Sequence, residues 1–303
     1  MYHFITNPNS GHGAEAWHTI ENYLNAHEIE YRVHFTRHDS HATEIVRTLT
    51  EACEEINIIA LGGDGSVNEV INGITDLEKV NLGYIPTGSG NDLARALKLP
   101  KNVITCLEMV LSGKYRRSMD VGVMKTGSST RRFIVSSGFG FDAAVCYGIL
   151  HSNLKKVLNK IRLGGLVYLF VALKEIFSSN GNKVTLYTDD GEPETFDNCL
   201  FAAAMNHSYE GGGFCFCPVC IDDDGYLDMC LVSDISKIKF LALLPTAFSG
   251  KHVRFKKYVH IYRAKHFRLE SDKKLHTHTD GEIGEMSMVF EAYLENKKLI
   301  FCN

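Results

Sequence analysis

The sequence has no apolar run long enough to cross a bilayer. The longest run, residues 163–173, contains two glycines and falls well short of the roughly 20 residues that a membrane-spanning helix needs. Positive charge is not in excess either, since the formal net charge is −4, so nucleic acid is not expected as a partner. These absences favour an ordinary globular protein, in agreement with a hydrophobic content of 45% and a charged content of 22%.

Neither a secretory signal nor a complete metal-binding cysteine pattern is found. The nine cysteines are scattered without even spacing, and the N-terminus lacks the pattern of a signal peptide, so we expect a cytoplasmic protein with reduced thiols. Cys215, Cys217 and Cys220 resemble a metal cluster, but no second CxxC pair accompanies them. A zinc or iron–sulfur site is therefore not expected there.

The first part of the chain alternates between predicted strands and helices. A length of 303 residues favours two domains rather than one. The expected strands are residues 2–6, 31–36, 57–61 and 82–85, each followed by a loop and a helix. This alternation predicts an α/β domain with a parallel sheet and helices on its faces.

The stretch from residue 57 to residue 74 has the features of a phosphate-binding element. A short apolar run of strand length is followed by three glycines within residues 62–65. Ser66, with Glu69 three residues later, is the capping-box pattern of a helix start. Strand, glycine turn and helix direct free N–H groups and the positive end of a helix dipole toward one point, which suits a phosphate. Asp64 in this turn is expected to lie unpaired beside the phosphates and so indicates Mg²⁺, because a carboxylate beside a phosphate needs a cation between them.

Two further strands of this domain end in loops rich in turn residues. These loops are residues 7–13 and 86–92, and ligands bind at the carboxyl ends of parallel strands. The chain has no GxxxxGK[ST] P-loop, no HRD or DFG set, and no GxGxxG after its first strand. A Rossmann dehydrogenase is therefore not expected, and the three glycine-rich loops are left to supply the phosphate contacts.

The pattern changes after about residue 113, where a second, mainly antiparallel β-rich domain is expected. We place the boundary at Asp120, so that residues 1–120 and 121–289 form the two domains, and whether residues 290–303 return to the first domain stays open. A hairpin is expected from residues 118–126 and 131–139, followed by a helical stretch over residues 142–178. The later strands are expected at residues 183–188, 195–205, 226–233, 259–270, 274–279 and 286–293.

Three segments of the second domain carry candidate chemistry. Residues 222–228 are acidic enough for a divalent cation but lack the alternation of an EF-hand loop, so an Asp-Gly turn is the alternative. Residues 276–282 bring His276, His278 and two carboxylates to a strand end. The helical stretch has an apolar face flanked by lysines within residues 150–162; this suits peripheral contact with an anionic lipid surface, and an ordinary packed helix is the alternative.

Together these motifs resemble the bacterial soluble diacylglycerol kinase family, whose members are lipid kinases related to sphingosine and ceramide kinases. The motifs that carry the resemblance are NP with SG in residues 7–11, GGDGSVNEV at 62–70, PTGSGNDLAR at 86–95, DG at 224–225 and DGE at 280–282. The resemblance covers essentially the whole chain. It implies an ATP-binding domain, a β-rich lipid-substrate domain, and a cleft between them for nucleotide and lipid.

The resemblance also implies roles for individual residues. Asp64, Asp92 and Asp120 are expected to hold a Mg²⁺–water network near the phosphates, and Glu282 is expected to be the general base. The residues expected to contact ATP are Asn7, Ser10, Gly11, Thr36, Gly62, Gly63, Asp64, Gly65, Ser66, Val67, Asn68 and Ser89. A structural Mg²⁺ is expected at the Asp224 side chain, with the carbonyl oxygens of Ile221 and Tyr226 as its neighbours.

The expected activity is transfer of the γ-phosphoryl group of ATP to the hydroxyl of a lipid alcohol, foremost diacylglycerol, which gives phosphatidic acid. One alternative is a kinase of a soluble nucleotide such as NAD, because NAD kinases share the GGDG turn. The other is a non-catalytic nucleotide or lipid sensor, which would be expected to have lost Asp64 or Glu282. We expect a cytoplasmic protein that visits the membrane surface transiently, and whether it forms a homodimer stays open.

Overall fold

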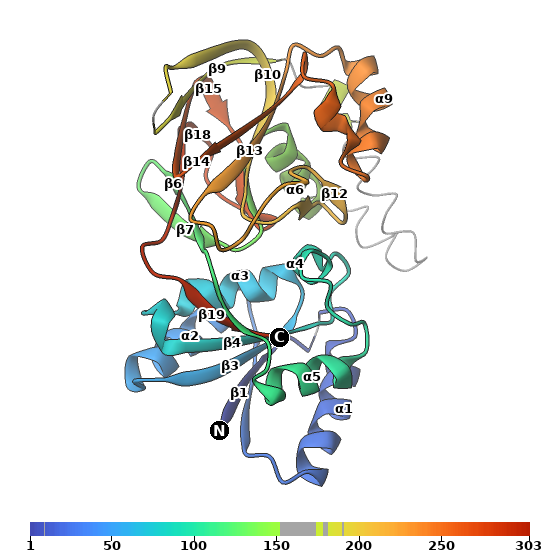
Figure 1. The fold of residues 1–303 in the computed structure, drawn as a ribbon, viewed down its shortest axis with the longest axis vertical. Helices are drawn as coiled ribbons and strands as arrows, with labels where there is room; N and C mark the ends of the chain where they lie inside the picture. The colour runs from blue at the N-terminus through green and yellow to red at the C-terminus, as the bar shows by residue number, and fades with distance from the viewer. Residues whose placement is uncertain (9, 152–173, 178–180, 190) are drawn as a thin grey trace.

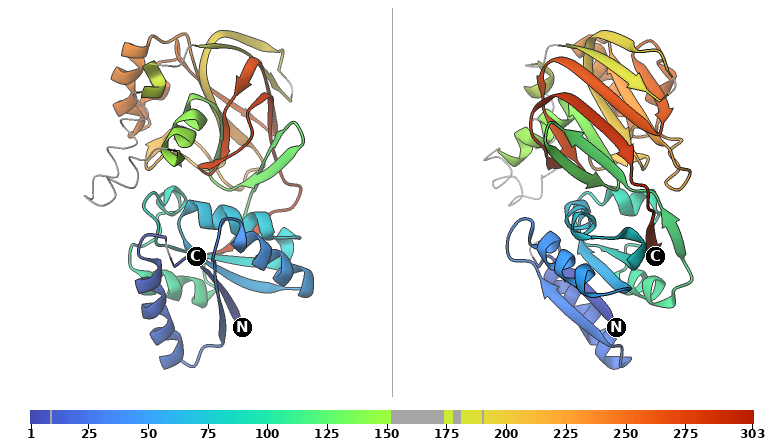
Figure 2. Two further views of the ribbon diagram at one scale, coloured as in Figure 1. Left: turned by 180° about the vertical axis from the view of Figure 1, so that it is seen from behind. Right: turned by 90° about the vertical axis from the view of Figure 1, so that its left-hand side faces the viewer.

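The structure is a computed structural model that describes residues 1–8, 10–151, 174–177, 181–189 and 191–303. The described residues form two large sheets, one in each of two domains, and one small two-stranded sheet (Figure 1). Figure 2 shows the same two domains from behind and from the side, with both chain termini in the lower one.

The first domain is built on a mostly parallel six-stranded sheet in the order β2-β1-β3-β4-β19-β5. The C-terminal strand β19 pairs in parallel with β4 and antiparallel with β5, so the chain ends inside this sheet. The strands are β1 (Tyr2–Thr6), β2 (Tyr31–Phe35), β3 (Ile56–Gly62), β4 (Val80–Pro86), β5 (Arg116–Met119) and β19 (Leu299–Cys302).

Helices cover both faces of this sheet, and that explains why β3 is almost wholly apolar. Ile58 and Ala60 point into one core with α2 and α3, whereas Ile59 and Leu61 point into a second core with α1 and α5. A strand buried on both faces has no solvent side and needs no polar alternation. The helices are α1 (Gly13–Ala26), α2 (His41–Ala52), α3 (Asp64–Gly73), η1 (Leu77–Lys79), α4 (Asp92–Ala96) and α5 (Val103–Ser112).

The second domain contains an eleven-stranded sheet whose strand pairs are all antiparallel. A separate two-stranded hairpin, β11–β12, faces the first domain. The strands are β6 (Gly122–Thr126), β7 (Ser129–Phe133), β8 (Ser136–Gly140), β9 (Asn182–Thr188), β10 (Glu194–Met205), β11 (Tyr209–Glu210), β12 (Phe214–Cys215), β13 (Leu227–Ser233), β14 (Val259–Ala264), β15 (His266–Leu275), β16 (Thr277–Thr279), β17 (Glu282–Ile283) and β18 (Ser287–Leu294). Its helices are α6 (Phe141–Leu150), α9 (Lys237–Ala247) and η2 (Lys251–Arg254).

The predicted fold class, an α/β domain with a parallel sheet followed by a mainly antiparallel domain, is confirmed. The single strand expected over residues 259–270 is wrong, because the chain breaks at Lys265. There it changes partner, from β13 on one side of the break to β9 and β18 on the other. Such a change of partner is tertiary and leaves no mark in an alternating pattern.

The capping box predicted at Ser66 and Glu69 is also wrong. Helix α3 begins at Asp64, after Gly63 at the N-cap, so Ser66 already lies inside its first turn. The carboxylate of Glu69 instead accepts a hydrogen bond of 3.0 Å from the amide of Ala42, in the first turn of α2. Glu69 therefore satisfies a free amide of a neighbouring helix rather than one of its own.

The lysine-flanked apolar face predicted within residues 150–162 lies, apart from its first two residues, outside the described residues. In the described part of the chain, no helix combines the length and the apolar character that crossing a bilayer requires.

Candidate active site

The three glycine-rich loops of the first domain meet at the carboxyl edge of its sheet. The amide of Thr87 donates to the carbonyl of Gly62 at 2.8 Å, and the amide of His12 donates to the carbonyl of Thr87 at 3.3 Å. A Cβ atom on Gly88 would lie 2.6 Å from the Cα of Gly63, so only glycine allows these two backbones to approach. The side-chain oxygen of Ser10 faces the same turn.

The other predicted nucleotide contacts are distributed around this edge. Thr36 follows β2, and its amide donates to the carbonyl of Thr6 at the end of β1 at 2.9 Å. Ser89 is exposed on the β4–α4 loop. The hydroxyl of Ser66 occupies the space that a Cβ atom on Gly62 would need. Val67 is fully buried in the domain core, so its backbone alone could contact a nucleotide.

Asp64 joins two of the glycine loops. Its carboxylate accepts hydrogen bonds from the amides of Asp92 at 3.0 Å and Leu93 at 3.1 Å, which are the first two residues of α4. The prediction that this carboxylate lies unpaired beside phosphates is therefore wrong in its premise. Burial nevertheless raises the pKa of Asp64, and the hydrogen bonds from α4 oppose that shift.

Asp92 connects the first domain to the β11–β12 hairpin of the second. One of its oxygens pairs with the guanidinium of Arg95, and the other accepts a hydrogen bond of 2.7 Å from the amide of Gly212. Burial raises the pKa of Asp92 to about 6, and the negative charge of Asp64 acts in the same direction. Two buried carboxylates with raised pKa values form a site where a bound cation would relieve unfavourable charge.

Glu282 of the second domain faces the glycine turn of the first. A Cβ atom on Gly65 would lie 2.6 Å from a carboxylate oxygen of Glu282, which places that oxygen at the first turn of α3. Gly281, just before it, has a φ of +84°, a conformation that glycine adopts without strain. The turn therefore directs Glu282 at the loop where a phosphate is expected.

Asp280 has a structural task in the same turn. Its carboxylate accepts hydrogen bonds from the amides of Ile134, Val135 and Ser136 at 2.8–3.0 Å and from the side-chain amide of Asn68 at 2.8 Å. Burial raises its pKa to about 6, and these donors act the other way. Asn68 was predicted as an ATP contact, but its side chain is buried and spans the two domains.

Sequence reasoning missed a buried cluster behind Glu282. Nε2 of His278 lies 3.2 Å from Asp142 of α6 and 3.2 Å from Glu210 of β11. The amide of Gly281 donates to Nδ1 of the same ring at 3.2 Å, and the proton on Nε2 is shared with the two carboxylates. Burial acts to lower the pKa of His278, but the negative groups around the ring, Glu210 and Asp142 among them, raise it well above its usual value. Asp142 and Glu210 come from different elements, and no sequence spacing could have brought them together.

The placement of His278 bears on which residue accepts the substrate proton. The ring is fully buried and both nitrogens have partners. An imidazole in that position has no lone pair left for a substrate hydroxyl. The alternative base His278 is thus less suitable than Glu282, and its contacts make it a support for the turn.

Asp120 lies with the acidic loop rather than with the glycine loops. Its carboxylate accepts a hydrogen bond of 2.8 Å from the amide of Gly225 and pairs with the ammonium of Lys298 at 3.0 Å. Its own amide donates to the carbonyl of Asp222 at 2.7 Å. These contacts anchor the acidic loop to the start of the second domain.

The acidic loop has an excess of negative charge that a divalent cation would match. Asp224 accepts a hydrogen bond from the amide of Tyr226 and pairs with Arg263 at 3.1 Å, whereas Ile221 and Tyr226 are partly exposed. Among the described residues in contact here, four carboxylates face three cationic side chains, which leaves one negative charge. These residues are Asp120, Asp222, Asp224 and Asp228 with Arg117, Arg263 and Lys298. The donor set therefore fits Mg²⁺.

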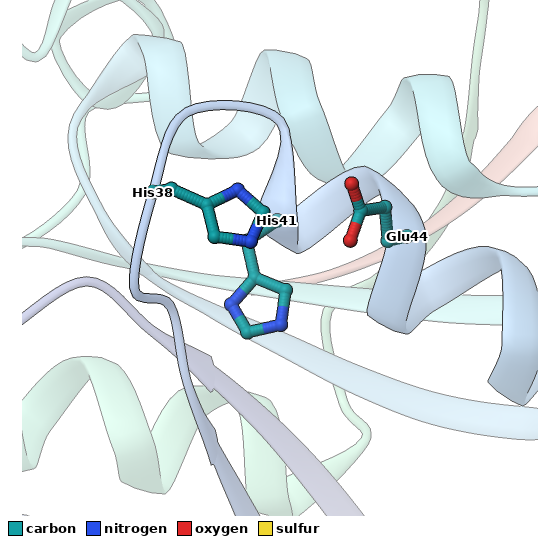
Figure 3. Close-up of side chains that lie close together, drawn as sticks. All are labelled: His38, His41 and Glu44. Carbon is teal, nitrogen blue, oxygen red and sulfur yellow. The ribbon is translucent and has the colours of Figure 1, made fainter.

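An exposed cluster at the end of β2 does not fit a metal. Figure 3 shows the rings of His38 and His41 together at the start of α2, with Glu44 further along the helix. The ring centroids lie 4.5 Å apart. The amide of Arg37 donates to Nδ1 of His41 at 3.0 Å, so the ring proton is on Nε2 and neither nitrogen has a free lone pair.

A cavity of about 480 Å³ lies elsewhere at the domain boundary. Its lining includes Leu97, Tyr115, Arg117 and His207, and none of the predicted site residues. We assign the site to the glycine loops and Glu282 rather than to this cavity, because the convergent polar groups with raised pKa values lie there.

Two family models match this chain. The model described as "Diacylglycerol kinase catalytic domain" matches residues 1–124, and the model described as "YegS C-terminal NAD kinase beta sandwich-like domain" matches residues 138–293. Together they cover both domains of the structure.

Curated relatives and solved structures agree with these models. A Bacillus subtilis protein named "Putative lipid kinase YtlR" is 29% identical over 92% of this chain and 92% of its own. A diacylglycerol kinase of the same organism is 27% identical over 93% of this chain and 89% of its own.

Among solved structures, a diacylglycerol kinase from Bacillus anthracis has a TM-score of 0.70 at 19% identity, covering 99% of this chain and 96% of that one. An NAD kinase from Archaeoglobus fulgidus in complex with ATP has a TM-score of 0.56 at 13% identity, covering 100% of this chain and 94% of that one. At these identities the structures show a shared fold. With both domains matched by the family models, the chain belongs to the diacylglycerol kinase family and is a nucleotide-binding lipid kinase.

Proposed function

We propose that the protein transfers the γ-phosphoryl group of ATP to the hydroxyl of diacylglycerol and so produces phosphatidic acid. The observation that carries this proposal is the meeting of Glu282 with the glycine turn at Gly65. A carboxylate placed at the first turn of α3 stands where an acceptor hydroxyl must approach a bound phosphate.

The first domain supplies the nucleotide site. The loops around Ser10, Gly63 and Gly88 meet at one edge of the sheet, and the start of α3 adds a positive dipole end. Asp64 and Asp92 lie at this edge and fit Mg²⁺, which would neutralise phosphate charge when bound. We assign Asp120 to the same Mg²⁺ network. Its carboxylate contacts the acidic loop at Gly225, so it lies nearer to the second domain than Asp64 and Asp92 do.

Glu282 acts as the general base in this proposal. It accepts the proton of the lipid hydroxyl as that oxygen forms a bond to the γ-phosphorus, and the bond from the γ-phosphorus to the β,γ-bridging oxygen breaks to release ADP. Phosphoryl transfer depends mainly on positioning, which the rigid Asp280–Glu282 turn provides.

Diacylglycerol is proposed as the acceptor because several relatives, from Bacillus subtilis and Mycobacterium tuberculosis among others, bear the name diacylglycerol kinase. Phosphatidylglycerol, a sphingoid base and an isoprenoid alcohol offer the same hydroxyl chemistry. NAD offers a soluble acceptor and represents the competing activity.

The test is incubation with ATP labelled in the γ-phosphate and each of these acceptors in detergent micelles. We expect labelled phosphatidic acid from diacylglycerol with added Mg²⁺ and little label in the other products. An Asp64→Asn protein purified in parallel serves as the control for a contaminating kinase. Preferred labelling of another lipid would change the substrate, and preferred labelling of NAD would overturn the proposal.

A further inference from the structure

Helix α9 is apolar on both of its faces. Phe240 and Ala247 are buried in the core of the second domain. The opposite side carries Ile238, Ala242 and Pro245, all exposed, and Ile238 is 78% exposed. A surface helix normally places polar residues toward water, and a helix that is apolar all round is typical of one that is covered on both sides.

Two exposed aromatic side chains extend this apolar face. Phe248 follows α9 and is 55% exposed, and Phe255 follows η2 and is 43% exposed. Figure 1 places α9 at the outer edge of the second domain, on the side that also carries α6 and β12, and Figure 2 agrees from behind. Contiguous exposed apolar groups of this size mark an interaction surface.

The chain around this face is strongly basic. Residues 235–258 contain six lysines and arginines and no aspartate or glutamate, although the whole protein has a formal charge of −4. Lys251, Arg254, Lys256 and Lys257 are exposed, and none of them pairs with a carboxylate within the part of the chain that the structure describes.

The basic and apolar groups belong to one surface. The ammonium of Lys239 in α9 donates to the hydroxyl of Tyr258 at 3.1 Å, and Lys257 lies over the same ring at 5.8 Å. We name this region the α9–η2 surface and define it as residues 238–257 on their exposed side. An exposed apolar helix face beside unpaired basic side chains has the composition of a helix that lies in a membrane interface.

We propose that the α9–η2 surface docks the protein on the anionic face of a lipid bilayer. This proposal rests on the proposed lipid kinase function, and it names the surface through which the enzyme reaches the membrane that contains its substrate. Basic side chains near an anionic surface are attracted to it, and the apolar side chains between them insert at the headgroup level.

A second copy of the chain is a poorer occupant of this surface. In a two-fold contact the same patch faces itself, so each unpaired lysine would approach the lysines of its partner. Like charges placed opposite one another across an interface cost several kcal/mol. An anionic bilayer has the complementary charge.

The surface is connected to the active site through the β11–β12 hairpin. The ring of Phe248 stacks on Phe214 of β12 at 4.1 Å between centroids. Across the hairpin, the amide of Gly212 donates to Asp92, and Glu210 lies 3.2 Å from His278. Helix α9 is therefore linked by direct contacts to the hairpin that binds Asp92 of the first domain.

The experiment is co-sedimentation of the full chain with vesicles of phosphatidylcholine alone, and with vesicles containing about 30 mol% phosphatidylglycerol. Wild type should bind the anionic vesicles and bind phosphatidylcholine weakly. Lys256→Gln/Lys257→Gln should weaken partitioning roughly 25-fold, since each basic side chain contributes about fivefold. Ile238→Ser/Phe255→Ser should weaken it on the order of tenfold or more.

The matched control is Lys101→Gln/Lys114→Gln, two exposed lysines of the first domain that change the net charge by the same amount. Equal loss of binding in this control, or wild-type binding by both surface variants, would overturn the proposal. So would an Ile238→Ser/Phe255→Ser protein that changes its oligomeric state and not its binding to vesicles. Thermal melts of all variants show whether they are folded.

Failure of this proposal and failure of the proposed function give different results. If the α9–η2 surface is correct and diacylglycerol is wrong, the protein binds anionic vesicles through these residues but phosphorylates another lipid. If the surface is wrong and diacylglycerol is right, the variants bind vesicles as wild type does and phosphatidic acid still forms. Activity on short-chain diacylglycerol in micelles should be unchanged in Lys256→Gln/Lys257→Gln.

Discussion

Glu282 and His278 are close in the chain, but their surroundings suit them to different tasks. The Glu282 carboxylate faces the glycine turn at Gly65 across the domain boundary. The His278 ring is buried, with Nδ1 accepting from Gly281 and Nε2 between two carboxylates. One residue is placed to react, and the other holds the turn that carries it.

Replacing Glu282 by glutamine tests this division. Glu282→Gln keeps the shape of the side chain and removes the base, so kcat should fall by about 10²–10⁴-fold. The Kd for ATP should be nearly unchanged, because the nucleotide loops belong to the other domain. Initial rates with micellar substrate and a fluorescent ATP analogue measure the two quantities. Near-normal kcat in Glu282→Gln together with loss of activity in His278→Asn would show that the histidine is the base.

His207 gives the protein a pH-dependent stability that is independent of catalysis. Burial lowers its pKa to about 4, although Asp222 lies 3.4 Å from its Nδ1. Because the folded pKa lies below the usual value of 6.5, the unfolded chain takes up a proton that the folded chain refuses. The contribution to stability is therefore complete above pH 6.5 and is lost as the pH falls toward 4.

We expect the free energy of unfolding to fall by about 2 kcal/mol from this group between pH 7.5 and pH 5. Urea unfolding curves at several pH values measure it. His207→Gln should flatten the dependence over that range, whereas the exposed His12→Gln should leave it as in wild type. An unchanged slope in His207→Gln would assign the acid sensitivity to other groups.

At the level of elements, the sequence pattern predicts those whose periodicity reflects their own burial. The alternation of strands and helices in the first domain, the turn between β6 and β7, and the loops that follow β1, β3 and β4 all follow from local sequence. The expected hairpin strands 118–126 and 131–139 are each divided in two, as β5 with β6 and as β7 with β8. The start of α3 is misread because Ser66 and Glu69 have the spacing of a capping box, while Gly63 occupies the N-cap. A local motif is a weak guide where a tertiary partner, here the amide of Ala42, competes for the carboxylate.

Contacts between distant elements could not be predicted in this way. The pairing of Asp64 with the amides of α4 and the cluster of Asp142, Glu210 and His278 depend on how three loops and two domains pack. Sequence gives the residues of a site and their loops, but not which polar atoms already have partners. That is why Asp64 is predicted to be unpaired.

The Asp280–Glu282 turn is the element on which positioning depends. Asp280 accepts from three backbone amides and from Asn68, and asparagine could offer only one oxygen to these donors. Asp280→Asn should lower the free energy of unfolding by about 3 kcal/mol, because buried amides lose their acceptor. It should also lower kcat, since Glu282 is no longer held.

Urea unfolding measures the stability of Asp280→Asn, and Asp197→Asn is the matched control. Asp197 is exposed and pairs with Lys183 at 3.8 Å, so its loss should cost less than about 1 kcal/mol. Equal destabilisation by the two substitutions would contradict the structural task given to Asp280.

For the molecule as a whole, polar contacts fix the two domains relative to each other. Asn68 of α3 donates to Asp280, and Arg131 of β7 donates to Asn68 at 2.7–2.9 Å. On the other side, Asp92 accepts from Gly212. These contacts bracket the glycine turn, so that Glu282 is held over it by both domains. Negative and positive charges also lie in different parts of the molecule. The acidic loop is near the domain boundary, and the basic α9–η2 surface is at the outer edge of the second domain.

The acidic loop leads to the prediction on metal removal. The unmatched carboxylate charge around Asp224 makes the folded state a better ligand for Mg²⁺ than the unfolded chain, so Mg²⁺ should raise the melting temperature. At free Mg²⁺ about 100-fold above its Kd, the stabilisation is about 2.7 kcal/mol. EDTA should therefore lower the melting temperature of wild type by several degrees.

Asp224→Ala should blunt the response to EDTA, and Asp223→Ala should keep it, since the ligand set uses Asp224 and the carbonyl oxygens of Ile221 and Tyr226. If chelation shifts wild type and Asp224→Ala equally, Mg²⁺ acts elsewhere, and the charges of this loop are met by Arg117, Arg263 and Lys298 alone.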